Sequence, residues 1–164
     1  MKIAALALLA FGCATTAIAD PVPKPAPVRR PPAKGCVAKG TPVFEIDHKA
    51  DPGAKLATSS LRLYESGAWT YEPKDAEGKP EPAKRGCLAA DEKTAVKADL
   101  EVPWKVTTAQ FHCMAHSSAF TEYSVSGKLV YTARLCSGKT LDEASQKALT
   151  DLEARLTKAV NAAS

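Results

Sequence analysis

Two histidines and one cysteine lie close together in the segment AQFHCMAHSSAF, residues 109–120. In a helix, His112 and His116 would share one face, because residues four apart are neighbours there, and such a pair can bind zinc. A zinc site needs three or four ligands, and the only other histidine of the chain is His48, far away in the sequence. A small hydrolase or metal-dependent enzyme using His48, His112 and His116 is therefore an alternative hypothesis, which requires the three imidazoles to meet in space.

Cysteine chemistry offers two further interpretations of the same segment. Cys113 could be a nucleophile, since a neighbouring imidazole can produce the reactive thiolate. After residue 35, however, the chain contains an even number of cysteines: Cys36, Cys87, Cys113 and Cys136. An even number in an exported chain predicts two disulfides, and oxidation leaves no thiolate for catalysis or metal binding. We therefore favour a structural role for the segment.

The pairing of these cysteines follows from a predicted hairpin. That hairpin places Cys136 opposite His116, close to Cys113. We therefore predict the disulfides Cys113–Cys136 and Cys36–Cys87, each of which would stabilise the fold by about 3 kcal/mol through restriction of the unfolded chain. Spacing alone leaves the three connectivities of four cysteines open.

Other motifs with a known chemical mechanism are missing from the sequence. It contains no G-x-S-x-G nucleophile elbow, no phosphate-binding glycine loop and no H-E-x-x-H motif. Glu45, Asp47 and Asp51 form an acidic group that could act in acid–base chemistry or bind calcium. Glu45 and Asp47 alternate along a predicted strand, as solvent-facing side chains do, so we interpret them as surface residues. We expect no catalytic residue and no cofactor.

The first nineteen residues, MKIAALALLAFGCATTAIA, are typical of an export signal. Lys2 precedes a short apolar stretch, and Ala17 and Ala19 supply the small side chains that signal peptidase requires, which predicts cleavage before Asp20. No apolar stretch reaches the about 20 residues that span a bilayer, so we expect no transmembrane segment. Lipidation at Cys13, in LLAFGC, is the alternative and would make an outer-membrane lipoprotein. The predicted location is periplasmic or extracellular.

Residues 20–35 contain six prolines and four basic side chains. Such a segment buries too little apolar surface to offset its ordering entropy, which predicts an extended polyproline linker. Without the five basic and one acidic side chains of residues 1–35, the 22 Lys and Arg and the 18 Asp and Glu leave 17 of each sign. Residues 36–164 are therefore neutral, and we exclude nucleic-acid binding, which requires a positive surface.

Residues 36–164 suffice for one domain with a single core. Alternating side chains predict a strand at 42–48 and a hairpin at 59–73. A type I turn at 64–67, with Gly67 in the left-handed region, gives the hairpin one apolar face. The residues on that face are Leu61, Leu63, Trp69 and Tyr71.

A second hairpin is predicted at residues 119–136, with a turn of the same type at 124–127, after a polar loop at 78–86. Its apolar face would contain Ala119, Thr121, Tyr123, Leu129, Tyr131, Ala133 and Leu135. One helix is predicted to begin at the N-cap Asp91 and to end before Pro103. A second helix is predicted over 140–160, with Thr140 and Glu143 as a capping box. Its apolar stripe is Leu141, Ala148, Leu152, Leu156 and Ala159.

The element order β-β-β-α-β-β-α predicts an α+β fold, in which two helices pack on one face of an antiparallel sheet of about five strands. The leading functional hypothesis is an exported, non-enzymatic binding module that contacts a protein or a cell-envelope component. An inhibitor of a secreted hydrolase would be one version of it. The predicted contact surfaces are the loops 49–58 and 74–86, because a cross-linked scaffold presents loops well.

Overall fold

The structure is a computed structural model that describes residues 36–109 and 117–163. The predicted export signal, the lipidation site at Cys13 and the predicted linker lie outside the described residues. The same is true of His112, Cys113 and His116.

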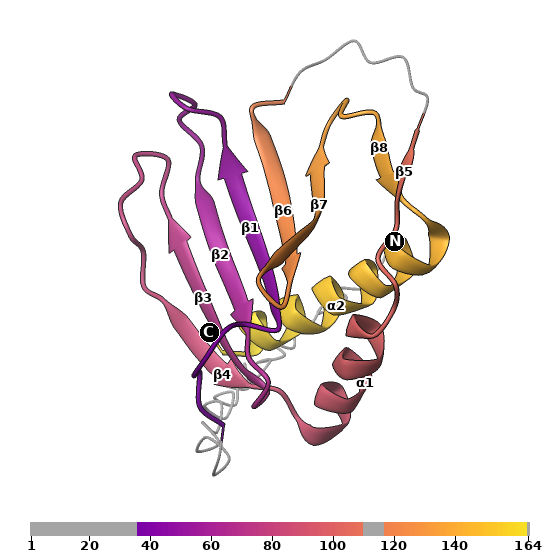
Figure 1. The fold of residues 1–164 in the computed structure, drawn as a ribbon. Helices are drawn as coiled ribbons and strands as arrows, with labels where there is room; N and C mark the ends of the chain where they lie inside the picture. Colours follow the sequence, from indigo (N-terminus) through magenta and orange to yellow (C-terminus); the bar gives the residue numbers. More distant parts are fainter. Residues whose placement is uncertain (1–35, 110–116, 164) are drawn as a thin grey trace, which may run out of the picture. The chain divides into compact units, whose positions relative to one another are not determined.

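The described residues form a six-stranded antiparallel sheet, a two-stranded sheet and two helices (Figure 1). The strand order of the larger sheet is β4-β3-β2-β1-β6-β7. Its strands are β1 (Phe44–Ala50), β2 (Thr58–Leu63), β3 (Ala68–Lys74), β4 (Lys84–Cys87), β6 (Ala119–Val125) and β7 (Lys128–Arg134). The smaller sheet pairs β5 (Val106–Thr108) with β8 (Lys139–Leu141), and the helices are α1 (Ala90–Leu100) and α2 (Glu143–Ala162). The predicted α+β class is confirmed.

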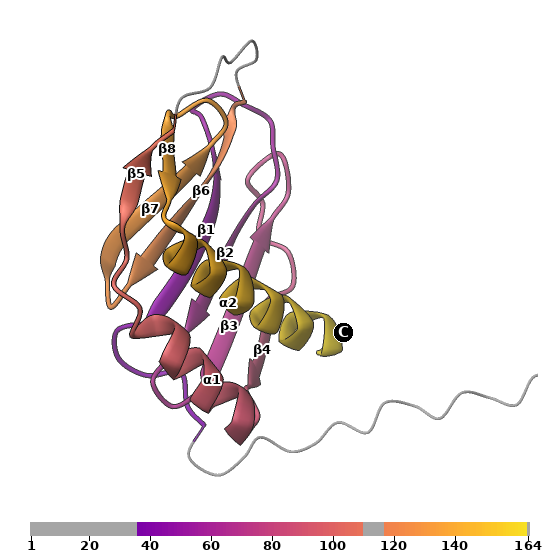
Figure 2. The ribbon, with the colours of Figure 1, turned by 90° about the vertical axis from the view of Figure 1, so that its right-hand side faces the viewer.

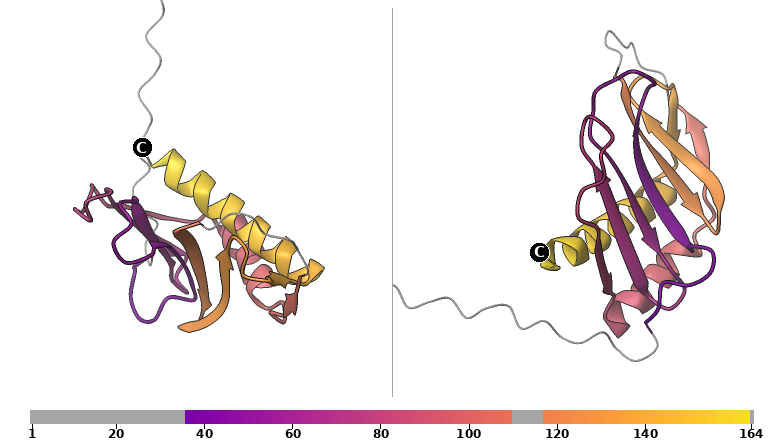
Figure 3. Two further views of the ribbon diagram at one scale, coloured as in Figure 1. Left: turned by 90° about the horizontal axis from the view of Figure 1, so that it is seen from above. Right: turned by 90° about the vertical axis from the view of Figure 1, so that its left-hand side faces the viewer.

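Both helices lie on the same side of the large sheet, as the sequence predicted (Figure 2). Helix α2 crosses the strands diagonally, and α1 lies beside α2 near one end of the strands. The other face of the sheet is not covered by either helix (Figure 3, right). The core therefore forms between one sheet face and α2.

That core consists of large apolar side chains from both layers. The sheet and α2 supply Phe44, Ile46, Leu61, Leu63, Trp69, Tyr123, Leu149, Leu152, Leu156 and Val160. Burying each such side chain stabilises the fold by about 1.5–3 kcal/mol. Leu152 and Leu156, which the predicted stripe contained, are fully buried, so the stripe is correct in its central part.

The first hairpin has the predicted register. Leu61 pairs with Tyr71 and Leu63 with Trp69, which places all four on the helix-covered face. The amide of Gly67 donates to the carbonyl of Tyr64 at 2.8 Å, and Gly67 has a φ of 84°. Glycine adopts this left-handed conformation without strain, which is why the turn forms here.

The predicted register of the second hairpin is wrong. Its turn is formed by Ser126 and Gly127, which both have positive φ, instead of by residues 124–127. Tyr123 pairs with Tyr131, whereas the next residue of β6, Ser124, pairs with Leu129 and skips Val130. Val130 is therefore an extra residue, a β-bulge, and it moves Leu129 away from the core face.

Exposure agrees with this correction. Leu129 is 59% exposed and Leu135 is 58% exposed, although both were predicted on the apolar face. Ala119 is exposed as well. Tyr123 is buried and stacks on Tyr131 with a centroid distance of 6.0 Å, so the inner part of the predicted face is correct.

Both predicted helix starts are wrong by about two residues. The N-cap of α1 is Ala89, not Asp91, and the Glu92 carboxylate accepts a hydrogen bond from the Ala89 amide at 3.3 Å. The N-cap of α2 is Asp142, whose carboxylate accepts from the Ser145 amide at 2.9 Å. Thr140 belongs to β8 and pairs with Thr107, so strand pairing overrides its capping propensity.

Three further strands, β4, β5 and β8, were missed. The end of the predicted polar loop at 78–86 is part of β4, which pairs with β3. Leu141, predicted as the first helical contact, is a buried residue of β8. The first strand was predicted at 42–48; β1 runs from Phe44 to Ala50, so both of its ends lie two residues later.

Candidate functional site

Of the three histidines considered for an enzyme site, the structure describes only His48. It lies on β1 and is exposed, and its Nδ1 atom is 2.9 Å from the Thr121 hydroxyl. Within residues 36–109 and 117–163, no group of three or more His, Cys, Asp or Glu residues could hold a metal ion. The convergence of His48 with His112 and His116 stays a prediction.

The three acidic residues Glu45, Asp47 and Asp51 do not act as one site. Glu45 accepts from the Arg62 guanidinium at 3.0 Å, and Asp47 accepts from the Ser60 hydroxyl. Asp51 forms an ion pair with Arg134. Each carboxylate is therefore bonded to a different partner on the uncovered sheet face.

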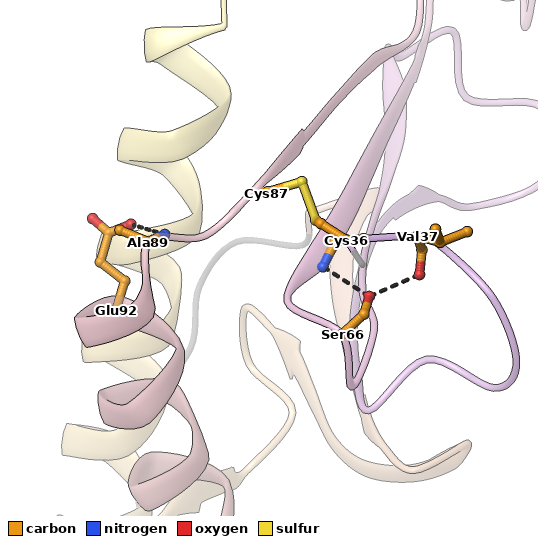
Figure 4. Close-up of a disulfide and its surroundings, with 7 residues drawn as sticks. Cys36, Val37, Ser66, Cys87, Ala89 and Glu92 are labelled. Carbon is orange, nitrogen blue, oxygen red and sulfur yellow. Dashed lines mark hydrogen bonds between the residues drawn. A yellow bond between two sulfur atoms is a disulfide. The ribbon is translucent and has the colours of Figure 1, made fainter. Parts of the chain in front are cut away.

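One predicted disulfide is present. Cys36 and Cys87 are bonded, and they connect the start of the described chain to the edge strand β4 (Figure 4). Cys136 is also disulfide-bonded, but its predicted partner Cys113 lies outside the described residues, so that pairing stays a prediction. The hairpin does not support this pairing, because its strand β7 ends at Arg134. Cys136 lies beyond the strand, with a φ of 71°.

The two loops predicted as contact surfaces lie at the same end of the sheet (Figure 1). The loop after β3 is held by its own hydrogen bonds. The Asp75 carboxylate accepts from the amides of Glu77 and Lys79, and the Glu81 amide donates to the carbonyl of Pro73. Lys84, at the end of the predicted loop, belongs to β4. This loop is therefore shorter than the sequence predicted.

A large cavity of the described residues is a groove between α1 and one end of the sheet. Its volume is about 730 Å³, and we call it the α1 groove. Six apolar side chains line it: Val43, Leu63, Leu88, Val96, Leu100 and Val125. Four charged side chains also line it: Glu65, Lys93, Lys97 and Glu101.

The α1 groove exists because α1 packs on α2 and not closely on the sheet. Only Val96 of α1 is buried. Two ion pairs hold α1 to α2: Asp99 with Arg155 at 3.5 Å, and Glu92 with Lys158 at 3.6 Å. Because α1 is bound along its α2-facing side, the side that faces the sheet is left partly open.

The opposite wall of the groove is the β2–β3 turn, and several bonds fix its position (Figure 4). The Ser66 hydroxyl donates to the carbonyl of Val37 at 2.7 Å and accepts from the Ala68 amide at 3.2 Å. The Leu88 amide donates to the carbonyl of Gly67 at 2.9 Å. Because the Cys36–Cys87 disulfide anchors the same region, this wall is preformed.

A second cavity of about 680 Å³ lies between α2 and the strands, and His48 is among its lining residues. Three of its polar side chains, His48, Thr150 and Glu153, are already hydrogen-bonded. Glu153 accepts from the Tyr123 hydroxyl at 2.7 Å, and burial together with this hydrogen bond raises the pKa of Tyr123. His48 contacts Thr121. This cavity therefore offers fewer unbonded groups to a ligand than its size suggests.

The sequence prediction missed the α1 groove. The apolar residues that line it come from separate segments, so no local pattern reveals it. The one available sign is the sequence of α1, ADEKTAVKADL, which has too few large apolar residues to cover a sheet.

No protein-family model, curated protein or solved structure matches this chain. Within the described part of the chain, no helix is long and apolar enough to cross a membrane.

Proposed function

We propose that this protein is an exported, non-enzymatic binding module that holds a ligand or partner in the α1 groove. The observation that carries the proposal is the groove itself, an apolar concavity with a fixed wall and charged groups at its rim. Small-molecule sites are typically clefts of about 300–1,000 Å³ with mostly apolar walls and a few polar groups. The α1 groove fits this description.

Export is part of the same proposal. It is supported by the sequence of residues 1–19 and by the Cys36–Cys87 disulfide, which is typical of oxidising compartments. Residues 20–35 would then serve as a spacer between the domain and the cell envelope, with a lipid anchor at Cys13 as one variant.

The non-enzymatic part is supported by the bonding state of the reactive groups. The acidic side chains of the uncovered sheet face are bonded to Arg62, Ser60, Lys49 and Arg134. Such cross-strand pairs stabilise a sheet, and each of these four carboxylates is engaged in one of them or in a neighbouring surface bond.

A metal-dependent enzyme using His48, His112 and His116 is the second candidate. It is favoured by one observation: the Thr121 hydroxyl engages Nδ1 of His48, as a partner of a metal-binding imidazole would, and leaves Nε2 for a metal. Metal analysis of the native protein separates the two candidates. Stoichiometric zinc that the His48→Ala variant loses would favour the enzyme over the binding module.

The binding proposal is tested by filling the groove. Thr94 lines the groove on α1, whereas Ala98, one turn further along, is exposed and does not line it. We expect Thr94→Trp to abolish the capture of envelope components by the native protein, while Ala98→Trp captures them as the wild type does. Equal capture by both variants would contradict a role of the groove.

A further inference from the structure

We infer that the α1 groove binds a zwitterionic amphiphile, with its single acyl chain between α1 and the sheet and its phosphate and ammonium groups at the rim. This inference rests on the proposed binding function and adds the chemical class of the ligand.

The acyl chain is inferred from the groove's walls. Val125 on the sheet side and Leu100 on α1 are partly exposed, so a chain inserted between them has apolar contacts on both sides, above the buried Leu63 and Val96. An apolar chain gains about 0.8 kcal/mol for each CH₂ group that it buries. A groove of about 730 Å³ is large enough for a single extended chain.

The head group is inferred from the charges at the rim. Lys97 and Glu101 form a pair with each other at 4.0 Å. Lys93 on α1 and Glu65 on the β2–β3 turn have no ion-pair partner among the described residues. One unpaired cation and one unpaired anion are complementary to a phosphate and an ammonium group within one ligand, and less so to a purely anionic or cationic one.

The position of Lys93 supports the proposed contact of Lys93 and Glu65 with one head group. Its Cδ atom lies 3.3 Å from the position that a Cβ atom on Gly67 would occupy, so its aliphatic stem packs on the turn that also carries Glu65. Lys93 therefore crosses from α1 towards the opposite wall. Lys93 and Glu65 therefore both line the groove, from its two opposite walls.

The test compares three amphiphiles with the same dodecyl chain, each below its micelle concentration. These are dodecylphosphocholine, dodecyl sulfate and dodecyltrimethylammonium, and isothermal titration calorimetry measures their binding to the native protein. We expect dodecylphosphocholine to bind at least tenfold more tightly than the other two. Equal affinity for all three, or preference for a singly charged head, would overturn the inference.

Two charge reversals locate the head group. We expect Lys93→Glu and Glu65→Lys each to weaken dodecylphosphocholine binding roughly tenfold, because each replaces an attraction by a repulsion. The control variant Lys55→Glu changes the same charge on an exposed loop residue outside the groove and should bind as the wild type does. Circular dichroism confirms that all variants are folded, and an equal loss in the control would contradict the assignment.

The failure of this inference can be distinguished from the failure of the proposed function. If no amphiphile binds but Thr94→Trp still abolishes capture of a protein partner, the groove is a binding site for a protein and the lipid inference is wrong. If Thr94→Trp changes neither amphiphile binding nor the capture of a partner, both the amphiphile inference and the proposed function are wrong.

Discussion

Trp69 and Gly86 pair across β3 and β4, and the indole ring covers the glycine. A Cβ atom on Gly86 would lie 2.5 Å from Cζ2 of Trp69, closer than non-bonded carbons approach. We expect Gly86→Ala to lower the free energy of unfolding by about 1–3 kcal/mol, as overpacking does. Urea denaturation measures the change.

The control for this prediction is a double-mutant cycle with Trp69→Phe, whose smaller ring leaves room for the new methyl group. The double variant should be more stable than the sum of the single changes indicates. Additive effects would show that the two side chains do not clash.

Tyr123 is the second residue with a distinct environment. Burial, together with the hydrogen bond and the charge of Glu153, raises its pKa above the ordinary value of 10.0. The folded state therefore keeps its proton at a pH where the unfolded state loses it, so stability is complete below about pH 10 and falls as pH rises further.

We expect Tyr123→Phe to lose the hydrogen bond at neutral pH, at a cost of about 1 kcal/mol. The variant should also lose less stability than the wild type between pH 9 and pH 11, because it lacks the ionising group. Melting temperatures across this range measure both effects, and parallel curves for the two proteins would contradict the assigned environment.

At the level of elements, the N-terminus of α2 depends on Asp142. Hydrogen bonds from the Ser145 side chain and backbone amide lower the pKa of the Asp142 carboxyl. Because this pKa is lowered by folding, the Asp142 carboxylate stabilises the folded state above the unfolded pKa of 3.8. This stabilisation is lost as pH falls through the pKa of the folded state. We expect Asp142→Ala to lower the melting temperature at neutral pH, with a smaller difference from the wild type at pH 3.

Asp142→Asn is the control, because asparagine caps helices without a charge. Its melting temperature should lie between those of the wild type and Asp142→Ala. A pH-independent difference for the alanine variant would contradict the role of the charge.

The first hairpin, which its local sequence specifies, was predicted correctly, whereas elements that depend on distant partners were not. The first hairpin has one register that yields an apolar face and a glycine at the left-handed position, Gly67. In contrast, Thr140 and Asp142 are both good N-caps, and only the pairing of β8 with β5 decides between them. Strand β4 has the sequence KRGC, which carries no strand pattern, and forms because β3 offers it an edge.

The candidate site was the least predictable part for the same reason. The separation of α1 from the sheet arises because α1 packs on α2, a segment distant in the sequence. The sequence pointed to His48 and to two loops because their residue types stand out. The apolar residues of the α1 groove look like ordinary core residues until their positions are known.

At the level of the whole molecule, the Cys36–Cys87 disulfide joins parts of the chain 51 residues apart. Restricting a loop of that length in the unfolded state stabilises the fold by about 4 kcal/mol. We expect the Cys36→Ser/Cys87→Ser double variant to lose a comparable amount in urea denaturation, and also to weaken ligand binding, because the same disulfide fixes one wall of the groove. Unchanged binding would show that the wall is held by hydrogen bonds alone.

The central claim is that the α1 groove is where this protein binds. Site-specific photo-crosslinking in exporting cells tests it directly, with a diazirine lysine analogue at Lys97, which lines the groove, or at Lys147 on α2, which does not. The two side chains are equally accessible, with exposed fractions of 79% and 76%. The account predicts one dominant adduct at position 97 that position 147 does not give. The same adducts at both positions, or none at position 97, would contradict it.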